Sequence, residues 1–191
     1  MYNFRHDILL IDLETTGLFA SEHEIIQIGA VVLDKQTLKE KKSFSTFIKP
    51  KKWQKRNKES MHVNKISWEA LKDAPSLEEA IEKLEKIMPQ KLILAYYAGV
   101  LDIEFMKAAY KKLKKQWPFD HHYFNIWGLF YGYAALHLPM NNKKKFAGFG
   151  LEDFAEHFKI PVHGDLHDAL TDCRLEADIM RKVMEHFGKK K

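Results

Sequence analysis

The sequence predicts an α/β protein with one mixed five-stranded sheet flanked by helices. Two observations carry this prediction: three strand-like runs with short polar connections come first, and helices and strands alternate after them. Short connections favour antiparallel neighbours, whereas alternation of strand and helix is typical of parallel ones. A chain of 191 residues is long enough for a single domain with a full hydrophobic core.

The first three strands are expected over Asp7–Leu13, Glu24–Asp34 and Lys42–Lys49. A basic, loop-like segment should follow, from Pro50 to about Ser67. The apolar run Leu92–Ala95 is typical of a buried parallel strand, and His121–Ile126 is expected to be an edge strand.

Five helices are expected between residues 76 and 187. The first has Ser76 as its N-cap and Glu79 three residues later, which is the pattern of a capping box, and should run to about Met88. The other helices are expected over Asp102–Gln116, Trp127–His137, Leu151–Phe158 and Leu166–Phe187.

The composition is that of an ordinary globular protein, with 46% hydrophobic and 30% charged residues. The formal net charge of +5 favours an anionic partner. We expect neither a signal peptide nor a membrane span, because no long apolar stretch follows the N-terminus. The single cysteine, Cys173, is expected to be a buried thiol in a reducing, cytoplasmic setting.

The run Asp12-Leu13-Glu14-Thr15-Thr16-Gly17 carries the first chemical signal. Successive side chains of a strand point to opposite faces, so Asp12 and Glu14 should point the same way and Leu13 into the core. Two like charges on one face of a buried strand repel each other and lose hydration. Because hard divalent cations prefer carboxylate oxygens, the pair predicts a site for Mg²⁺ or Mn²⁺.

The second signal is the stretch from His167 to Asp172. Positions five apart in a helix lie about 140° from each other, so the two residues can share a site only if His167 sits at the helix mouth. A third signal is Asp102, which follows the strand at 92–95. The helix dipole would favour Asp102 there in any case, but ligands of α/β sheets also bind after the carboxyl ends of parallel strands.

Together these stretches resemble the DEDD superfamily of 3′-to-5′ exonucleases, in the subclass with a catalytic histidine (DEDDh), which includes the proofreading subunit of bacterial replicative DNA polymerase. The family motif D-x-E-T-T-G is matched by Asp12–Gly17, and H-x-A-L-x-D by His167–Asp172. The run Gly150–Pro161 resembles the segment before that last motif. The resemblance implies a ribonuclease-H-like fold, with a single exonuclease domain over 1–188 and a basic tail at 189–191.

The resemblance also implies two divalent ions, Mg²⁺ or Mn²⁺. Asp12 would bridge both ions, Glu14 and Asp172 would complete one metal shell, and Asp102 would hold the other ion largely through water. His167 would be the general base that deprotonates the attacking water. A pair of ions stabilises both the attacking and the leaving oxygen in phosphodiester cleavage.

Contacts to the terminal nucleotide are also implied, by Thr15, Thr16, Gly17, Leu18 and His62. For the residues that follow the metal strand, a simple strand-to-loop turn is the alternative. The middle family motif, H-N-x-x-F-D, is altered here: Tyr97, Ala98 and Leu101 stand where the family has His, Asn and Phe, and Asp102 is kept. The resemblance implies that this change affects binding of the 3′-terminal nucleotide and not the metal ligands.

The expected activity is therefore removal of 5′-mononucleotides from the 3′ end of a single strand, with DNA slightly favoured over RNA. A DNA polymerase subunit is a possible partner, and the oligomeric state is left open. Two alternatives remain: a nucleic-acid-binding accessory module with little catalysis, and an oligoribonuclease-like enzyme acting on short oligomers.

Two further sequence features, a basic segment and a pair of histidines, allow either a structural or a functional interpretation. The segment Lys49–Lys58 holds six basic residues around Trp53, which fits either a grip on a single strand or a solvated loop whose Trp53 covers the core edge. His121 and His122 are adjacent, so on a strand they would face opposite sides, and this argues against shared metal ligation.

Overall fold

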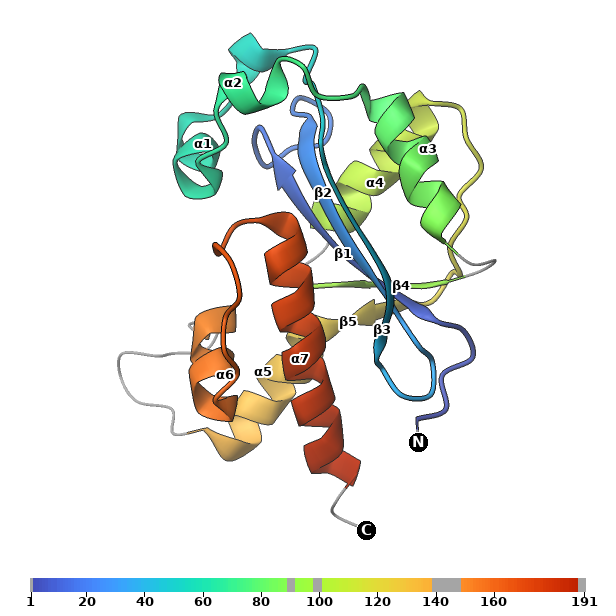
Figure 1. Ribbon diagram of the computed structural model, residues 1–191, viewed down its shortest axis with the longest axis vertical. Coiled ribbons are helices and arrows are strands. Elements are labelled where there is room, and N and C mark those ends of the chain that lie inside the picture. The colour runs from blue at the N-terminus through green and yellow to red at the C-terminus, as the bar shows by residue number, and fades with distance from the viewer. Residues whose placement is uncertain (1, 89–91, 98–100, 139–148, 189–191) are drawn as a thin grey trace.

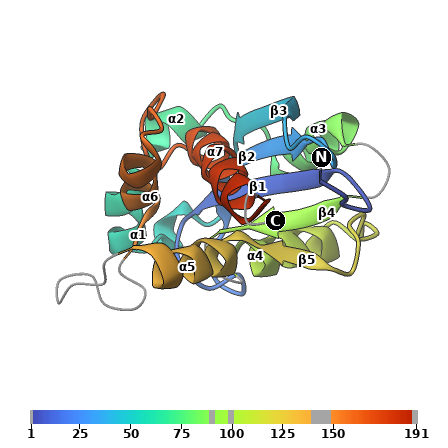
Figure 2. The ribbon, with the colours of Figure 1, turned by 90° about the horizontal axis from the view of Figure 1, so that it is seen from below.

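The computed structural model describes residues 2–88, 92–97, 101–138 and 149–188, and a mixed five-stranded sheet forms its centre. The strands are β1 (Ile8–Thr15), β2 (Ile25–Leu33), β3 (Glu40–Phe47), β4 (Ile93–Tyr96) and β5 (Tyr123–Asn125). They lie in the order β3-β2-β1-β4-β5 (Figure 2). The first three form an antiparallel meander, and β4 is parallel to both β1 and β5. The predicted fold class is confirmed, including the edge position of β5.

The helices are the 3₁₀-helix η1 (Trp53–Lys55), α1 (Lys58–Asn64), α2 (Trp68–Leu71), α3 (Leu77–Ile87), α4 (Leu101–Lys112), α5 (Ile126–His137), α6 (Leu151–Phe158) and α7 (Ala169–Gly188). Within the described ranges, none of them combines the length and the apolar character that crossing a membrane requires. The predicted basic tail at 189–191 and Ala98 lie outside the described residues.

Helices cover both faces of the sheet, and alternate residues of β1 contribute to two different cores. Leu9, Ile11 and Leu13 pack in the core that includes α3 and α4. Ile8 and Leu10 pack in the core that includes α5, α6 and α7. Figure 1 shows α7, in red, with α5 and α6 on one side of the sheet, and α3 and α4, in green, on the other. This alternation determines the face on which the polar residues at the end of β1 must lie.

The segment predicted to be a loop from Pro50 to Ser67 is partly helical, and that prediction was wrong for α1. Asn57 has an extended backbone, and its side-chain oxygen accepts a hydrogen bond from the backbone N–H of Ser60 at 3.0 Å. An asparagine N-cap satisfies one of the free N–H groups of the first helical turn. The basic residues around it masked this start signal in the sequence.

The helix expected from Asp102 to Gln116 ends earlier, at Lys112. Lys114 adopts a left-handed backbone conformation, with φ of 53°. The N–H of Lys115 then donates to the carbonyl of Tyr110 at 3.0 Å, which closes the last turn. Such a left-handed cap ends a helix without a proline, so the cap and not Pro118 sets the boundary.

Candidate active site

Asp12 and Glu14 lie near the end of β1 on the face that α7 covers. Leu13 between them is buried in the opposite core, as the alternation predicts. Asp12 pairs with Gly29 of β2 in the antiparallel register. Both carboxylates are half-buried, so they open toward a cleft rather than toward bulk solvent.

The start of α7 brings a second set of polar groups to the same place. His167 has a φ of 67°, and a residue in this left-handed conformation does not continue a right-handed helix. Asp168 caps the helix instead, because its Oδ1 accepts from both the N–H and the hydroxyl of Thr171 at 3.0 Å. The helix expected from Leu166 therefore begins at Ala169, and His167 lies at its mouth.

Gly29 allows α7 to come this close to the sheet. A Cβ atom at this position would lie 2.1 Å from the backbone carbonyl carbon of Ala169, which no side chain could tolerate without movement of the helix. A glycine inside a strand often marks such a close approach of another backbone. As a result, Asp172 in the first turn of α7 is buried against the end of β1.

The structure brings the predicted catalytic set together. Glu14, His167 and Asp172 each offer a ligand atom, and these atoms lie within 4.8 Å of one another. The backbone N–H of His167 donates to Oδ2 of Asp172 at 3.0 Å. Asp102, in the first turn of α4, is 1% exposed and near enough to Asp12 to influence its ionisation.

The electrostatics of this cluster are unfavourable in the protein alone. Burial, followed by the charges of Asp102 and Glu14, raises the pKa of Asp12 well above its ordinary value. Burial and the charge of Asp172 raise the pKa of Glu14 to about 8, although the Asn64 side chain opposes the shift. Burial also raises the pKa of Asp172. Each carboxylate is therefore held where its negative charge is costly.

These residues fit a divalent cation. Oδ1 of Asp172 is buried and has no hydrogen-bond partner in the part of the chain that the structure describes. A cation bound among the carboxylates would satisfy that oxygen and reverse the repulsion between the groups. Carboxylate oxygens are the ligands preferred by Mg²⁺, and Mn²⁺ accepts them equally.

A cleft of about 640 Å³ opens over the cluster. Asp12, Glu14, Asp172 and Glu176 give it an acidic floor, and His167 is exposed at its edge. Seven of its other lining side chains are apolar or aromatic, and six are polar: Leu13, Leu18, Val63, Tyr97, Leu101, Leu151 and Leu166, and Thr15, Asn57, Glu59, Ser60, Asn64 and Glu152. An apolar wall beside an acidic floor can accept a base or sugar next to a phosphate held through a cation.

Of the five residues predicted to contact the nucleotide, two line the cleft and three do not. Thr15 and Leu18 line the cleft, and the Leu18 side chain is 63% exposed there. Thr16 is buried, and its hydroxyl accepts from the N–H of Glu24 at 2.9 Å. Gly17 lies against the ring of His23. His62 is exposed and does not line the cleft, whereas the next residues, Val63 and Asn64, do.

Two buried polar residues that line the cleft were not predicted from the sequence. Asn64 is buried at the end of α1, where its amide donates to the carbonyl of Thr15 at 3.2 Å and also acts on Glu14. Recognition of the Asn57 cap would have placed this residue on a helix. Glu176 lies on α7, and its spacing of four from Asp172 was a usable signal because such residues share a helix face.

The altered middle motif has a structural consequence. The hydroxyl of Tyr97 donates to the carbonyl of Phe149 at 3.4 Å, and its ring packs near Phe130. Burial and the charge of Glu176 raise the pKa of Tyr97 to about 12. Tyr97 and Leu101 therefore give the cleft an apolar wall at positions where the family has polar and aromatic groups.

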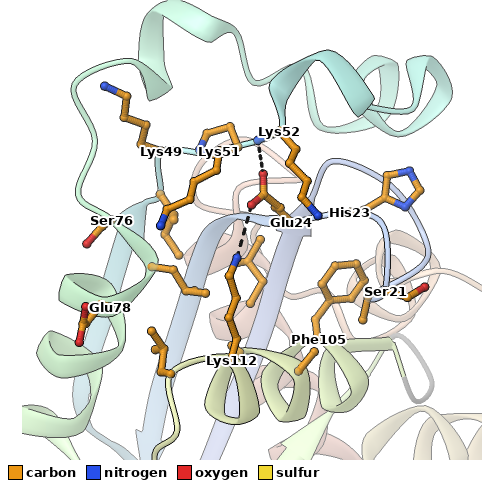
Figure 3. Close-up of a pocket in the computed structure, with 18 residues that line it drawn as sticks. Ser21, His23, Glu24, Lys49, Lys51, Lys52, Ser76, Glu78, Phe105 and Lys112 are labelled. Carbon is orange, nitrogen blue, oxygen red and sulfur yellow. Dashed lines mark hydrogen bonds and ion pairs between the residues drawn. The ribbon is translucent and has the colours of Figure 1, made fainter.

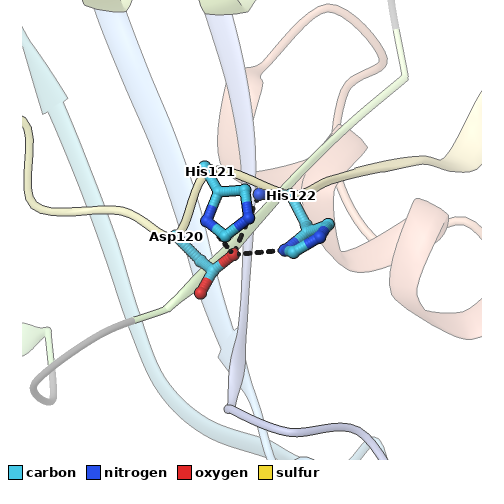
Figure 4. Close-up of side chains that lie close together, drawn as sticks. All are labelled: Asp120, His121 and His122. Carbon is cyan, nitrogen blue, oxygen red and sulfur yellow. Dashed lines mark hydrogen bonds and ion pairs between the residues drawn. The ribbon is translucent and has the colours of Figure 1, made fainter.

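A second His and carboxylate cluster lies just before β5. His121 and His122 do not face opposite sides, because they precede the strand; their ring centroids are 3.8 Å apart, and the sequence interpretation was wrong here. Nδ1 of His122 lies 2.7 Å from Oδ1 of Asp120, and Nδ1 of His121 lies 3.4 Å from it (Figure 4). The hydrogen bonds from His122 hold the pKa of Asp120 at about 2, so its charge is already stabilised.

The basic segment contributes to a separate cavity of about 310 Å³, shown in Figure 3. Oε2 of Glu24 accepts from the backbone N–H of Lys52 at 2.6 Å, and Nζ of Lys112 lies 3.6 Å from its Oε1. Trp53 stacks near Trp68, with the Arg56 guanidinium 4.7 Å from the centre of its ring. The backbone of this segment is therefore tied to Glu24, just before β2, and Glu24 in turn pairs with Lys112 of α4.

Comparison with known proteins identifies the family. The model of the exonuclease family, described as "Exonuclease", matches residues 9–180. The chain is therefore a member of the exonuclease family, and its members are 3′–5′ exonucleases that depend on divalent metals.

Individual relatives agree with this assignment. The DNA polymerase III subunit epsilon of Treponema pallidum (strain Nichols) is 28% identical over 178 residues, which are 93% of this chain and 76% of that protein. The PolC-type DNA polymerase III of Caldanaerobacter subterraneus subsp. tengcongensis is 26% identical over 94% of this chain, which spans only 12% of that protein.

The fold is shared with solved nucleases. The nuclease domain of 3′hExo, a DEDDh family member bound to rAMP, superposes with a TM-score of 0.70 at 18% identity, over 96% of this chain and 94% of that one. The predicted membership of the exonuclease family is confirmed, and the fold is shared with a DEDDh family member.

Proposed function

We propose that this protein removes 5′-mononucleotides from the 3′ end of single-stranded nucleic acid by a two-metal mechanism. The observation that carries the proposal is the cluster of buried and half-buried carboxylates that lines the cleft, with the exposed His167 beside it. Burial and the neighbouring carboxylates make these negative charges costly, and a phosphodiester bound through cations would complete the site.

Each acidic residue has a proposed role toward two Mg²⁺ or Mn²⁺ ions. Asp12 would serve both ions, Glu14 and Asp172 would hold one of them, and Asp102 would act on the other through water; the ligand atoms of Glu14 and Asp172 lie close together, and Asp102 is buried. When bound, the ions supply charge stabilisation to the attacking and leaving oxygens of the scissile phosphate. The buried, unpartnered oxygen of Asp172 supports its place in this set.

His167 is the proposed general base. Its backbone N–H is held by Asp172, which fixes the residue at the mouth of α7 while the side chain stays exposed at the cleft. An imidazole can accept a proton near neutral pH, so it can take the proton of the attacking water. The 3′-terminal nucleotide would lie against Leu18 and Thr15, with Thr16 and Gly17 shaping the loop; His62, which precedes the lining residue Val63, would contact it from outside the lining.

DNA is the slightly favoured substrate, because the relative from Treponema pallidum is a DNA polymerase subunit. A polymerase subunit is accordingly the proposed partner. The rAMP bound to 3′hExo supports RNA as the competing substrate. The buried thiol of Cys173 fits a reducing, cytoplasmic compartment.

A 5′-labelled single strand, incubated with Mg²⁺ or Mn²⁺, tests the proposal. We expect a ladder of products shortened from the 3′ end, and none after addition of a chelator. Folded protein that binds the strand without shortening it in either metal would instead support an accessory binding module.

A series of lengths from dinucleotides upward separates a strand-degrading enzyme from an oligoribonuclease-like one. Tyr97 and Leu101 at the altered motif give a specific reason to include short oligomers in that series. Matched DNA and RNA strands decide the sugar preference in the same experiment.

A further inference from the structure

Glu176 is an acidic residue of the cleft that the family motifs do not include. It lies on α7 four residues after Asp172, so the two side chains share one face of the helix. The residue is only 1% exposed and lines the same cleft as Asp12 and Glu14. A glutamate is almost never buried to this extent unless it is paired.

The protein itself provides little that would stabilise this carboxylate. Its Oε2 is buried and has no hydrogen-bond partner within the described residues. The charged groups that act on Glu176 are three further carboxylates, those of Asp12, Asp102 and Asp172. A buried acidic group that faces only like charges is costly, which leaves a cation from outside the chain as its natural partner.

A purely structural role for Glu176 has weak support. Tyr97, from the altered motif, is a polar side chain close enough to Glu176 for the glutamate charge to raise the pKa of the Tyr97 phenol. However, the Tyr97 hydroxyl donates its hydrogen to the carbonyl of Phe149. It is therefore committed to another acceptor and does not explain why Glu176 is buried in this position.

We propose that Glu176 is a fifth carboxylate of the metal centre and holds a divalent cation, directly or through one bound water. The proposal rests on the proposed function only in that it places metal ions in this cleft. Four carboxylates balance two dications, so a fifth gives the site an excess of negative charge. We expect this excess to tighten cation binding and to make the metal-free protein less stable.

Glu176→Gln tests the role because glutamine keeps the size of the side chain and removes its charge. Mn²⁺ is titrated into the protein and followed by calorimetry and by electron paramagnetic resonance. We expect Glu176→Gln to weaken Mn²⁺ binding by about 10-fold or more, the range reported for partners of metal sites. We also expect it to melt at a higher temperature than the wild type in the presence of a chelator.

Glu185→Gln is the matched control, because Glu185 is an exposed residue of the same helix and loses the same charge. It should bind Mn²⁺ and melt as the wild type does. If Glu176→Gln fails to fold, Glu176→Leu fills a similar volume and is judged by the same titration. Mn²⁺ affinity equal to that of the wild type in a folded Glu176 variant would overturn the proposal.

The outcomes for Glu176 and for the proposed function are distinguishable. A wild-type protein that binds Mn²⁺ but leaves the labelled strand intact contradicts the nuclease proposal alone, and the Glu176 titration is still decisive. A wild-type protein that binds no Mn²⁺ overturns both.

Discussion

Two clusters in this molecule bring histidine and carboxylate ligand atoms within 4.8 Å of one another, yet their electrostatics are opposite. Beside β5, the hydrogen bonds from His122 lower the pKa of Asp120 to about 2. In the cleft, burial and the charge of Asp172 raise the pKa of Glu14 to about 8. The comparison shows that two clusters with similarly close ligand atoms can differ in how far the protein stabilises the charge of their carboxylates. The cleft differs because burial and neighbouring carboxylates outweigh the hydrogen bonds that its acidic residues receive.

The largest expected effect is loss of activity on removal of a cleft carboxylate. Asp12→Asn should lower the rate of 3′-end shortening by about 10³-fold, the upper range for one lost electrostatic contact in an active site. The measurement is degradation of a labelled strand in Mg²⁺. Asp120→Asn should keep the wild-type rate, and a comparable loss in that variant would erase the distinction between the clusters.

Substitution of the cleft histidine, His167, should affect the reaction rate, whereas substitution of His122 beside β5 should not. His167→Ala should slow the reaction by about 10²-fold, as expected for loss of a general base, and should remove the fall in rate at acidic pH. The pH profile of single-turnover rates is the measurement. His122→Ala is the control and should leave the profile unchanged; full activity of His167→Ala at neutral pH would refute the assignment.

The stability of the metal-free protein should fall as the pH rises. The pKa of Glu14 in the folded protein is about 8 against an ordinary 4.5, so the folded state keeps a proton that the unfolded chain releases. This contribution is fully present below pH 4.5 and is lost as the pH rises toward about 8. Melting temperatures in a chelator measure it. Glu14→Gln should flatten the dependence, and Mn²⁺ should restore stability at high pH.

The cluster of Asp120, His121 and His122 should make a smaller contribution to stability, with the opposite pH dependence. The pKa of Asp120 is lowered from 3.8 to about 2, so its stabilisation is present above pH 3.8 and is lost as the pH falls through about 2. Asp120→Asn should therefore lower the urea midpoint slightly at neutral pH and have no effect near pH 2. Equal midpoints at both pH values would show that the cluster contributes nothing to stability.

Local sequence patterns predicted much of the fold and the central site. Alternation along β1 places Asp12 and Glu14 on one face and Leu13 in the opposite core, because a strand has a period of two residues. The Ser76 capping box at the start of α3 is present as predicted. If His167 and Asp172 share a site, helical geometry requires His167 to lie at the helix mouth; its φ of 67° places it there, before α7 begins at Ala169.

Other features depended on residues far apart in the chain. Gly29 of β2 admits the first turn of α7, and the resulting contact buries Asp172. The sequence contains Gly29 and Ala169 but does not show that their backbones meet. The positions of His121 and His122 were predicted wrongly because pairing with β4 sets the start of β5. That pairing begins at Tyr123, so both histidines lie before the strand.

The sequence by itself predicted the mixed sheet, the acidic residues that line the cleft and the family resemblance, because these depend on period, spacing and residue chemistry. Only the tertiary structure decided which carboxylates lack an internal counterion. Glu176 and Asp120 are both acidic in the sequence, but one is buried among like charges and the other is surrounded by hydrogen-bond donors. The energy of a charge depends on its surroundings in space, and folding alone sets those surroundings.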